Sequence, residues 1–436
     1  MDLLNHPLLR TDSYGKIFLY VNQDICACVP RHRIRMSEPV NPEHLLAAVK
    51  DALLRFPYLM VGIEKSKTQY VYRLLSTDPV VLPFDGQTMR YAIGSEDTHG
   101  YLFLVGYQND EIFMEYQHSI SDGRGFEEFI RCVLFNYLRH CGHPVENDGT
   151  VRTLDTFYSQ EESEDAYQKL DENYSSEGIY TKPEALHADA LSDLTDAPEI
   201  VTEVTFPFQS LRTAAHEYGV SPLSMISPLF CRAFYQKFGQ GSEKPVIAQI
   251  PVDLHPYVPS VTNRYFICFL DLPYEASYEN LPLPEIFRKT KDFLKAQMEP
   301  ELLLYRAKAA SDACSEIHNR DIPLAEKETA AQTLVHNFVH GDSFLITNVG
   351  EFKLPDCMRP YVLDYGAVLP SASQPFGMLI SSYGGKMKLS IAQRDHDMQV
   401  CTNFVKLLSE IGIDAAMKSY PFVVTRFSGQ AACPQF

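Results

Sequence analysis

One short stretch of the sequence combines side chains that could move a proton, namely Tyr116-Gln117-His118-Ser119-Ile120-Ser121-Asp122-Gly123-Arg124-Gly125. It follows an alternating apolar run typical of a strand and precedes a run with apolar residues at three- and four-residue steps, typical of a helix. His118 is therefore expected at the end of a strand and Asp122 at the start of a helix. An imidazole there can face a cleft, and its pKa is the closest to neutrality among side chains. His118 is thus a candidate general base.

The same residues allow a purely structural interpretation. Helix N-termini favour Asp at the capping position, and His118 would then be an ordinary histidine at a strand end. A His-x-x-x-Asp pattern by itself does not decide between the two interpretations.

Length and charge limit the classes of function. A chain of 436 residues predicts two domains, and 45% hydrophobic residues can fill two cores. The net charge of −18 argues against nucleic acid or an anionic membrane surface as the main partner. No apolar run approaches the roughly 20 residues that span a bilayer. The ten cysteines form no Cys-x-x-Cys, so we expect neither a disulfide framework nor a zinc site, and a cytoplasmic protein.

Periodicity predicts α/β structure in both halves of the chain. In the first half we expect a helix from Pro42 capped by Asn41, and strands at 17–21, 24–30, 31–36, 60–64, 71–75, 80–82, 101–108 and 111–117. In the second half we expect strands at 200–206, 245–251, 264–270, 344–352, 378–382 and 386–393. Helices are expected there at 208–218, from 221, across 283–310 and at 399–411. The intervening residues 143–198 are acidic and rich in turn formers, which predicts a mostly solvated crossover.

The stretch around His118 resembles the His-His-x-x-x-Asp-Gly signature of an acyltransferase superfamily. That superfamily includes chloramphenicol acetyltransferase, alcohol acetyltransferases, plant BAHD acyltransferases and the condensation domains of peptide synthetases. Gln117 stands at the first His of the signature, and His118 at the second, which does the chemistry in the family.

Two later segments extend the resemblance over about residues 15–415. Val252-Asp253-Leu254 with Asn263-Arg264 is similar to the family's Pro-Val-Asp-Leu-Arg … Gly-Asn segment, although His255 replaces its Arg. Thr347-Asn348-Val349-Gly350 is similar to its Ser-Asn-x-Gly segment. The order of the motifs along the chain is the strongest part of the likeness.

The resemblance implies an α/β (α+β) fold of two chloramphenicol acetyltransferase-like subdomains that meet in a V with a channel between them. The expected boundaries are 1–165 for the first subdomain, 166–195 for an acidic linker and 196–436 for the second.

The resemblance also implies a reaction. An acyl group would pass from a thioester, acyl-CoA rather than a carrier protein, to a small alcohol or amine, with His118 as base and no tightly bound cofactor. Asp122 would orient the loop by pairing with an arginine, for which Arg264 is the candidate and Arg33, Arg35 and Arg124 remain open. A carrier-protein-dependent condensation enzyme and a non-catalytic binding protein with the same fold are the alternatives.

Further residues receive roles from the same resemblance. Asn348 would stabilise the tetrahedral oxyanion, unless it only satisfies the turn before Gly350. The residues expected along the substrate channel are Gln117, Gly123, Thr347, Asn263 and Arg264.

Two other clusters are interpreted as surface features. His336 and His340, with Asp342 beyond, have helical spacing but no evident third metal ligand, so no metal site is expected. The basic residues of the 283–310 helices would form a solvated helix face rather than a phosphate site; they are Arg288, Lys289, Lys291 and Lys295.

Overall fold

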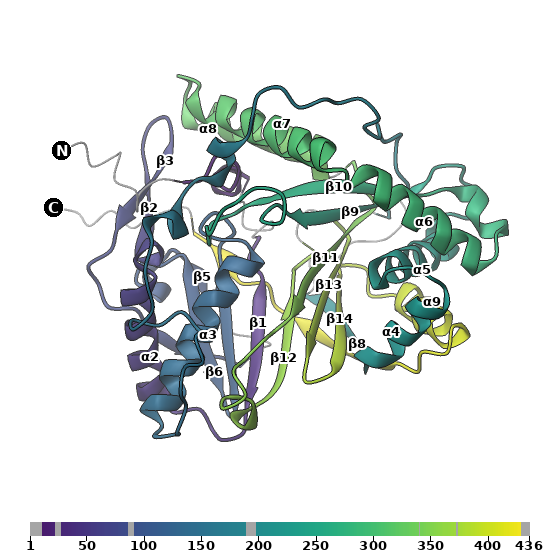
Figure 1. The fold of residues 1–436 in the computed structure, drawn as a ribbon. Helices are drawn as coiled ribbons and strands as arrows, with labels where there is room; N and C mark the ends of the chain where they lie inside the picture. Colours follow the sequence, from purple (N-terminus) through teal and green to yellow (C-terminus); the bar gives the residue numbers. More distant parts are fainter. Residues whose placement is uncertain are drawn as a thin grey trace.

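The computed structural model describes residues 11–21, 28–85, 91–188, 198–339, 341–371 and 374–428. Two large β-sheets form the frame of the molecule, and each has helices packed against its outer face (Figure 1). This is the expected α/β architecture with two hydrophobic cores, one beneath each sheet.

The first sheet has five strands in the order β12-β1-β7-β6-β4. Its strands are β1 (Arg31–Met36), β4 (Val81–Pro83), β6 (Phe103–Gln108), β7 (Glu111–Tyr116) and β12 (Val362–Val368). Helices α2 (Pro42–Arg55) and α3 (Gly123–His140) cover one face of it (Figure 1). Two small ribbons complete this half, β2 (Val61–Lys65) with β3 (Tyr70–Leu74) and β5 (Ala92–Ile93) with β16 (Arg426–Phe427).

Helices α2 and α3 begin where the sequence predicts. The side chain of Asn41 accepts hydrogen bonds from the amides of Glu43 and His44, and Pro42 occupies the first turn of α2. The carboxylate of Asp122 accepts from the amide of Gly125 and so caps α3. The hairpin of β6 and β7 then brings the chain directly to His118.

The second sheet has seven strands in the order β10-β9-β11-β13-β14-β8-β15. Its strands are β8 (Glu199–Pro207), β9 (Val246–Asp253), β10 (Ile267–Tyr274), β11 (Phe344–Glu351), β13 (Phe376–Tyr383), β14 (Lys386–Gln393) and β15 (Ala416–Phe422). The helices in this part of the chain are α4 (Phe208–Glu217), α5 (Pro222–Phe238), α6 (Leu283–Gln297), α7 (Pro300–Asn319), α8 (Leu324–Val339) and α9 (Gln399–Glu410). Of these, α8 and the end of α7 pack into the core of the first half. The predicted hairpin through Gly384-Gly385 and the last helix are confirmed.

Strand β12 links the two halves. It follows β11 of the second sheet in sequence, yet it pairs antiparallel with β1 at the edge of the first sheet. The chain then returns to the second sheet with β13. The sheets therefore do not divide at a single point of the sequence, and a division into folding units at 1–165 and 196–436 remains a proposal.

The predicted strand at 17–21 is wrong. These residues form a short helix, α1 (Ile17–Tyr20), because the Asp12 carboxylate accepts hydrogen bonds from the amides of Tyr14 and Gly15 and starts a turn. The predicted strand at 24–30 lies mostly outside the described residues, and residues 28–30 are not in a strand. The strand predicted at 264–270 begins only at Ile267.

The crossover is also less solvated than predicted. Glu162, Ser163 and Tyr167 are buried, and Glu162 forms an ion pair with Arg55 of α2, with oxygen to nitrogen distances of 2.8 and 2.9 Å. One carboxylate of this acidic segment, that of Glu162, therefore anchors the segment to the first half.

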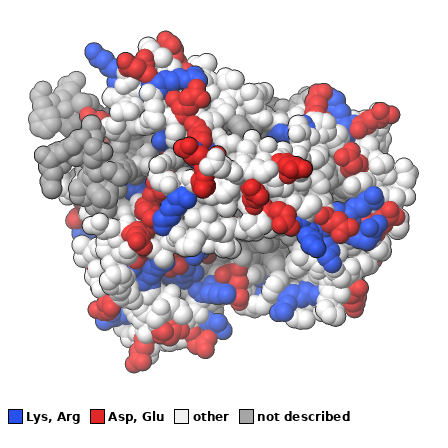
Figure 2. All heavy atoms as spheres, turned by 45° about the horizontal axis from the view of Figure 1, so that its top comes forward, with Lys and Arg blue, Asp and Glu red and all other residues white. Residues whose placement is uncertain are grey.

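None of the helices among the described residues is long and apolar enough to cross a membrane. On the face in Figure 2, acidic and basic side chains are interspersed.

Candidate active site

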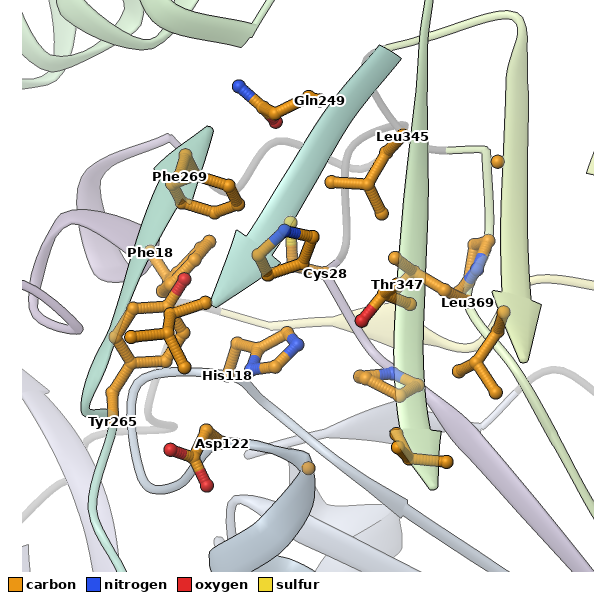
Figure 3. Close-up of a pocket in the computed structure, with 18 of the residues that line it drawn as sticks. Phe18, Cys28, His118, Asp122, Gln249, Tyr265, Phe269, Leu345, Thr347 and Leu369 are labelled. Atoms are coloured by element: carbon orange, nitrogen blue, oxygen red, sulfur yellow. The ribbon is translucent and has the colours of Figure 1, made fainter. Parts of the chain in front are cut away.

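A cavity of about 890 Å³ is lined by residues of both halves and contains His118 in its wall (Figure 3). The first half contributes the loop between β7 and α3, together with α1 and His32 of β1. The second half contributes residues of β9, β10, β11 and β13, and α7 and α8 add further side chains. A cavity of this size can hold a small-molecule ligand.

The imidazole of His118 is held by its own loop. Nδ1 lies 3.1 Å from the carbonyl oxygen of Ser121, so it donates its hydrogen there and leaves Nε2 without a hydrogen as a potential proton acceptor. The ring stacks on Phe18 with centroids 5.3 Å apart and meets the edge of Tyr265 at 5.6 Å. In Figure 3 the imidazole lies between Tyr265 and Thr347.

The surroundings of His118 favour its neutral form. Burial among these rings lowers the pKa of His118 to about 4, although the hydrogen bond to Ser121 raises it. At neutral pH the side chain is therefore ready to accept a proton.

Asp122 connects the two halves through backbone amides rather than through an arginine. Oδ1 accepts from the amide of Gly125 at 2.8 Å, and Oδ2 accepts from the amide of Phe266 at 3.1 Å. Among the described residues no arginine forms an ion pair with Asp122, so the predicted arginine partner is wrong. Burial raises the pKa of this carboxyl, and the two amides oppose that effect.

Arg264, the predicted partner of Asp122, is buried elsewhere. Its Nε donates to the carbonyl oxygen of Ser163 at 2.8 Å, and its guanidinium lies 5.5 Å from the centre of the Tyr58 ring. It does not line the cavity. It instead fastens the crossover to the second half.

Gln117 and Asn263 also stand behind the cavity wall rather than in it. Gln117 donates to the carbonyl oxygen of Phe18 and accepts from the amide of Ser119. Asn263 accepts a hydrogen bond from Arg152 through its side chain, and its backbone oxygen accepts from the Ser121 hydroxyl. The expectation that these residues line the channel is therefore wrong, because their polar groups are used to fix the loop that carries His118.

Close packing of the backbone explains why residue 125 is glycine. A Cβ at Gly125 would lie 2.0 Å from the carbonyl oxygen of Asn263, so the first turn of α3 can approach the second half only with glycine there. Gly123 lines the cavity beside Val349, as expected for a channel residue.

The structure brings Thr347 and Asn348 of β11 into the same cavity as His118, Asp122 and Gly123. The Oδ1 atom of Asn348 accepts from the amide of Gly350 at 2.9 Å. That bond satisfies the turn and leaves the Nδ2 hydrogens as donors. The two roles considered for Asn348 are therefore compatible.

Sequence analysis gave no individual role to three aromatic residues of the site. Phe18, Tyr116 and Tyr265 surround the His118 ring. Tyr116 and Tyr265 directly adjoin motif residues, which is the only signal the sequence offered. Phe18 lies in the segment that was predicted to be a strand.

Of the described residues in the two other clusters, only His336 lines the cavity. The described residues contain no group of three potential metal ligands; His336 lines the cavity, His340 lies outside the described residues, and Asp342 accepts from Lys182 and Gln249. Of the basic residues on α6, Arg288 pairs with Asp292 and Lys291 donates to the carbonyl oxygen of Gly219. None of the basic residues of this cluster lines the cavity.

Asp122→Asn should lower the free energy of unfolding by about 1–3 kcal/mol. The amide oxygen can still cap α3, but the Nδ2 hydrogens would oppose the N–H of Phe266, which loses its acceptor. Urea titration of both variants and wild type measures the loss, with the exposed Asp51→Asn as the control that should change little. Wild-type stability of Asp122→Asn would show that the link to Phe266 contributes nothing.

No family model matches the sequence, and no curated protein matches it. Solved structures do match. Polyketide synthase associated protein 5 from Mycobacterium tuberculosis superposes with a TM-score of 0.61 at 13% identity, over 92% of this chain and 98% of its own. TRI101 of F. sporotrichioides, in complex with coenzyme A and T-2, gives a TM-score of 0.61 at 13% identity, over 94% and 99%.

A condensation domain matches over a similar extent. A variant of the starter condensation domain of rhizomide synthetase RzmA, in complex with C8-CoA, gives a TM-score of 0.58 at 11% identity, over 91% of each chain. The chain therefore has the fold of these three structures, which is the chloramphenicol acetyltransferase-like fold that the sequence predicted.

Proposed function

We propose that this protein transfers an acyl group from an acyl-CoA thioester to a small alcohol or amine, with His118 as the general base. The observation that carries the proposal is the imidazole of His118, held through Nδ1 by Ser121, in the wall of a cavity that both halves line. The fold supports it, because TRI101 and the RzmA domain were solved with coenzyme A and C8-CoA respectively.

The reaction requires two proton transfers at one nitrogen. Nε2 of His118 takes the proton of the acceptor O–H or N–H as the acceptor attacks the thioester carbonyl carbon. The carbon–sulfur bond of the tetrahedral intermediate then breaks, and the imidazolium returns the proton to the leaving thiolate. No acyl group is attached to the enzyme at any stage.

The remaining residues of the site assist this step. Asn348 Nδ2 and the Thr347 hydroxyl are the donors that we assign to the oxyanion of the intermediate, since both line the cavity with His118. Asp122 acts through the loop, because it ties the first turn of α3 to Phe266 and so fixes the position of His118.

Thiol release tests the proposal and its choice of donor. Purified protein is incubated with acetyl-CoA or octanoyl-CoA and a panel of alcohols and amines, and free thiol and acylated product are both measured. Acceptor-dependent release with an acyl-CoA supports the proposal. If acyl transfer occurs only from a carrier-protein thioester, the proposed acyl-CoA donor is wrong. If no transfer occurs from any thioester, the proposed acyltransferase activity is wrong.

The rate of acyl transfer to a neutral alcohol should not vary through protonation of His118 between about pH 6 and 8. Burial lowers the pKa of His118 to about 4, so the base is neutral above that pH, and activity is lost as pH falls through about 4. A profile of kcat/KM against pH, with circular dichroism to verify folding at each pH, measures this. A midpoint near 6.5 would show that His118 is solvated like a free imidazole.

We also propose that the reaction takes place in the reducing cytoplasm. Several cysteines are buried as free thiols, among them Cys132, Cys231 and Cys401. Burial raises the pKa of the Cys132 and Cys401 thiols to about 12, so these thiols are unreactive fillers of the core.

A further inference from the structure

A buried carboxylate lies in the cavity wall on α3, one turn after Gly123. Glu127 is 5% exposed and lines the same cavity as His118. Its Oε1 accepts a hydrogen bond from the Tyr365 hydroxyl of β12 at 2.8 Å. Its Oε2 accepts none from the described residues and is not fully buried, so this oxygen is open to a ligand.

A second-layer network holds this carboxylate in place. Tyr365 gives its hydrogen to Glu127, so the Nδ1 of His32 donates to the Tyr365 oxygen at 2.8 Å. Tyr365 also stacks on Phe352, with ring centroids 4.1 Å apart. Burial lowers the pKa of His32 to about 3, so His32 is neutral and cannot serve as the counterion of Glu127.

The nearby cations form their ion pairs with other carboxylates, and Arg131 acts on Glu127 only at longer range. Arg131 pairs with Glu128 at 2.5 Å, and Arg124 lies 4.0 Å from Asp253. Among the described residues, no side-chain nitrogen of Lys, Arg or His lies within 4.0 Å of the Glu127 carboxylate. A buried carboxylate without a counterion is unfavourable unless it is protonated or a ligand supplies the positive charge.

We infer that Glu127 recognises the acceptor, and that the acceptor of the proposed transfer carries a protonated amine in addition to the group that is acylated. This inference rests on the proposed function and names its substrate class. The net charge of −18 agrees with it, because an acidic protein attracts cations.

The matched probes are ω-(dimethylamino)alkan-1-ols with two to eight carbons between nitrogen and oxygen, and the branched alkanols in which CH replaces the NH⁺ group. The tertiary amine stays protonated and forms no stable amide, so only the hydroxyl is acylated. With acetyl-CoA as donor, we expect one chain length at which the amino alcohol has the higher kcat/KM. In Glu127→Gln the ratio of kcat/KM for that pair should fall about 10- to 100-fold.

Glu410→Gln is the matched control. Glu410 is an exposed carboxylate at the end of α9 that does not line the cavity, so its removal should leave the ratio of each pair at the wild-type value. Tyr365→Phe supplies a second variant, because it removes the hydrogen bond that orients Glu127, and it should lower the same ratio by a smaller factor.

The pH dependence of the kcat/KM ratio in the wild-type protein is a further test that needs no variant. Burial raises the pKa of Glu127 to about 7, while the Tyr365 hydrogen bond and Arg131 oppose this, and Glu128 and Asp122 add to it. The exposed Lys353 also lines the cavity. The ratio for the preferred pair should therefore be high above pH 7 and fall as pH decreases through about 7.

The outcomes separate the two proposals. Equal kcat/KM values within every wild-type pair, or a ratio in Glu127→Gln equal to that of wild type, would overturn the role of Glu127 while acyl transfer stands. Absence of thiol release with the amino alcohols and the alkanols alike would overturn the proposed function itself.

Discussion

His118→Ala should lower the rate of acyl transfer about 10²- to 10⁴-fold, the range that general-base groups contribute. The variant removes the Nε2 acceptor that shares the cavity with the Thr347 and Asn348 donors. Because His118 is only half-buried and lies at the end of β7, the fold should persist. Thiol release with a saturating acceptor measures the rate.

A histidine far from the cavity provides the control. His140 lies in the last turn of α3 and pairs with Asp51 at 2.8 Å on the surface. His140→Ala should therefore retain wild-type turnover. If His118→Ala turns over as fast as His140→Ala, His118 is not the base, even though the fold assignment would stand.

Arg55→Met should lower the free energy of unfolding by about 3–5 kcal/mol. Arg55 is 2% exposed and donates to both carboxylate oxygens of Glu162, as well as to the Phe157 carbonyl oxygen. Its loss leaves Glu162 buried with the longer 3.3 Å contact to Arg152 and a 3.4 Å hydrogen bond from the Ser159 amide. Denaturant titration measures the change.

A double variant separates the ion pair from general packing. Arg55→Met combined with Glu162→Leu should recover much of the loss, because replacing both partners by apolar groups removes the uncompensated charge. Lys50→Met, which breaks the exposed pair with Asp78, should change stability by less than about 1 kcal/mol. A single variant Arg55→Met as stable as Lys50→Met would show that the crossover is held by other contacts.

The sequence predicted correctly several helix starts and turns that depend only on residues close to one another in the chain. The Asn41-Pro42 start of α2, the Asp122 cap of α3 and the hairpin at Gly384-Gly385 each depend on residues within a few positions of one another. The helix at 17–20 was missed because four apolar residues fit either period, and the turn at Asp12 that decides it lies outside the apolar run. Strand β12 was missed because its partner β1 is remote in sequence.

The sequence predicted some of the residues that share the site, but not which groups form hydrogen bonds with them. His118, Thr347 and Asn348 share a cavity, as the order of motifs implied. The partner of Asp122 could not be found from side chains, since the groups that satisfy it are backbone amides, which every residue except proline offers. Glu127 gave no signal because a carboxylate early in a helix is common for electrostatic reasons alone.

The return of the chain to β1 has a consequence for how the protein is made. His32 and Tyr365, which meet across β1 and β12, are 333 residues apart in sequence. At translation rates of roughly 5–20 residues per second, β1 must wait about 20–70 s before its neighbour leaves the ribosome. Throughout that time the nascent first sheet presents an open edge, which other unfinished chains can pair with. Conditions that keep unfinished chains apart, or chaperones that shield this edge, should therefore raise the yield of folded protein.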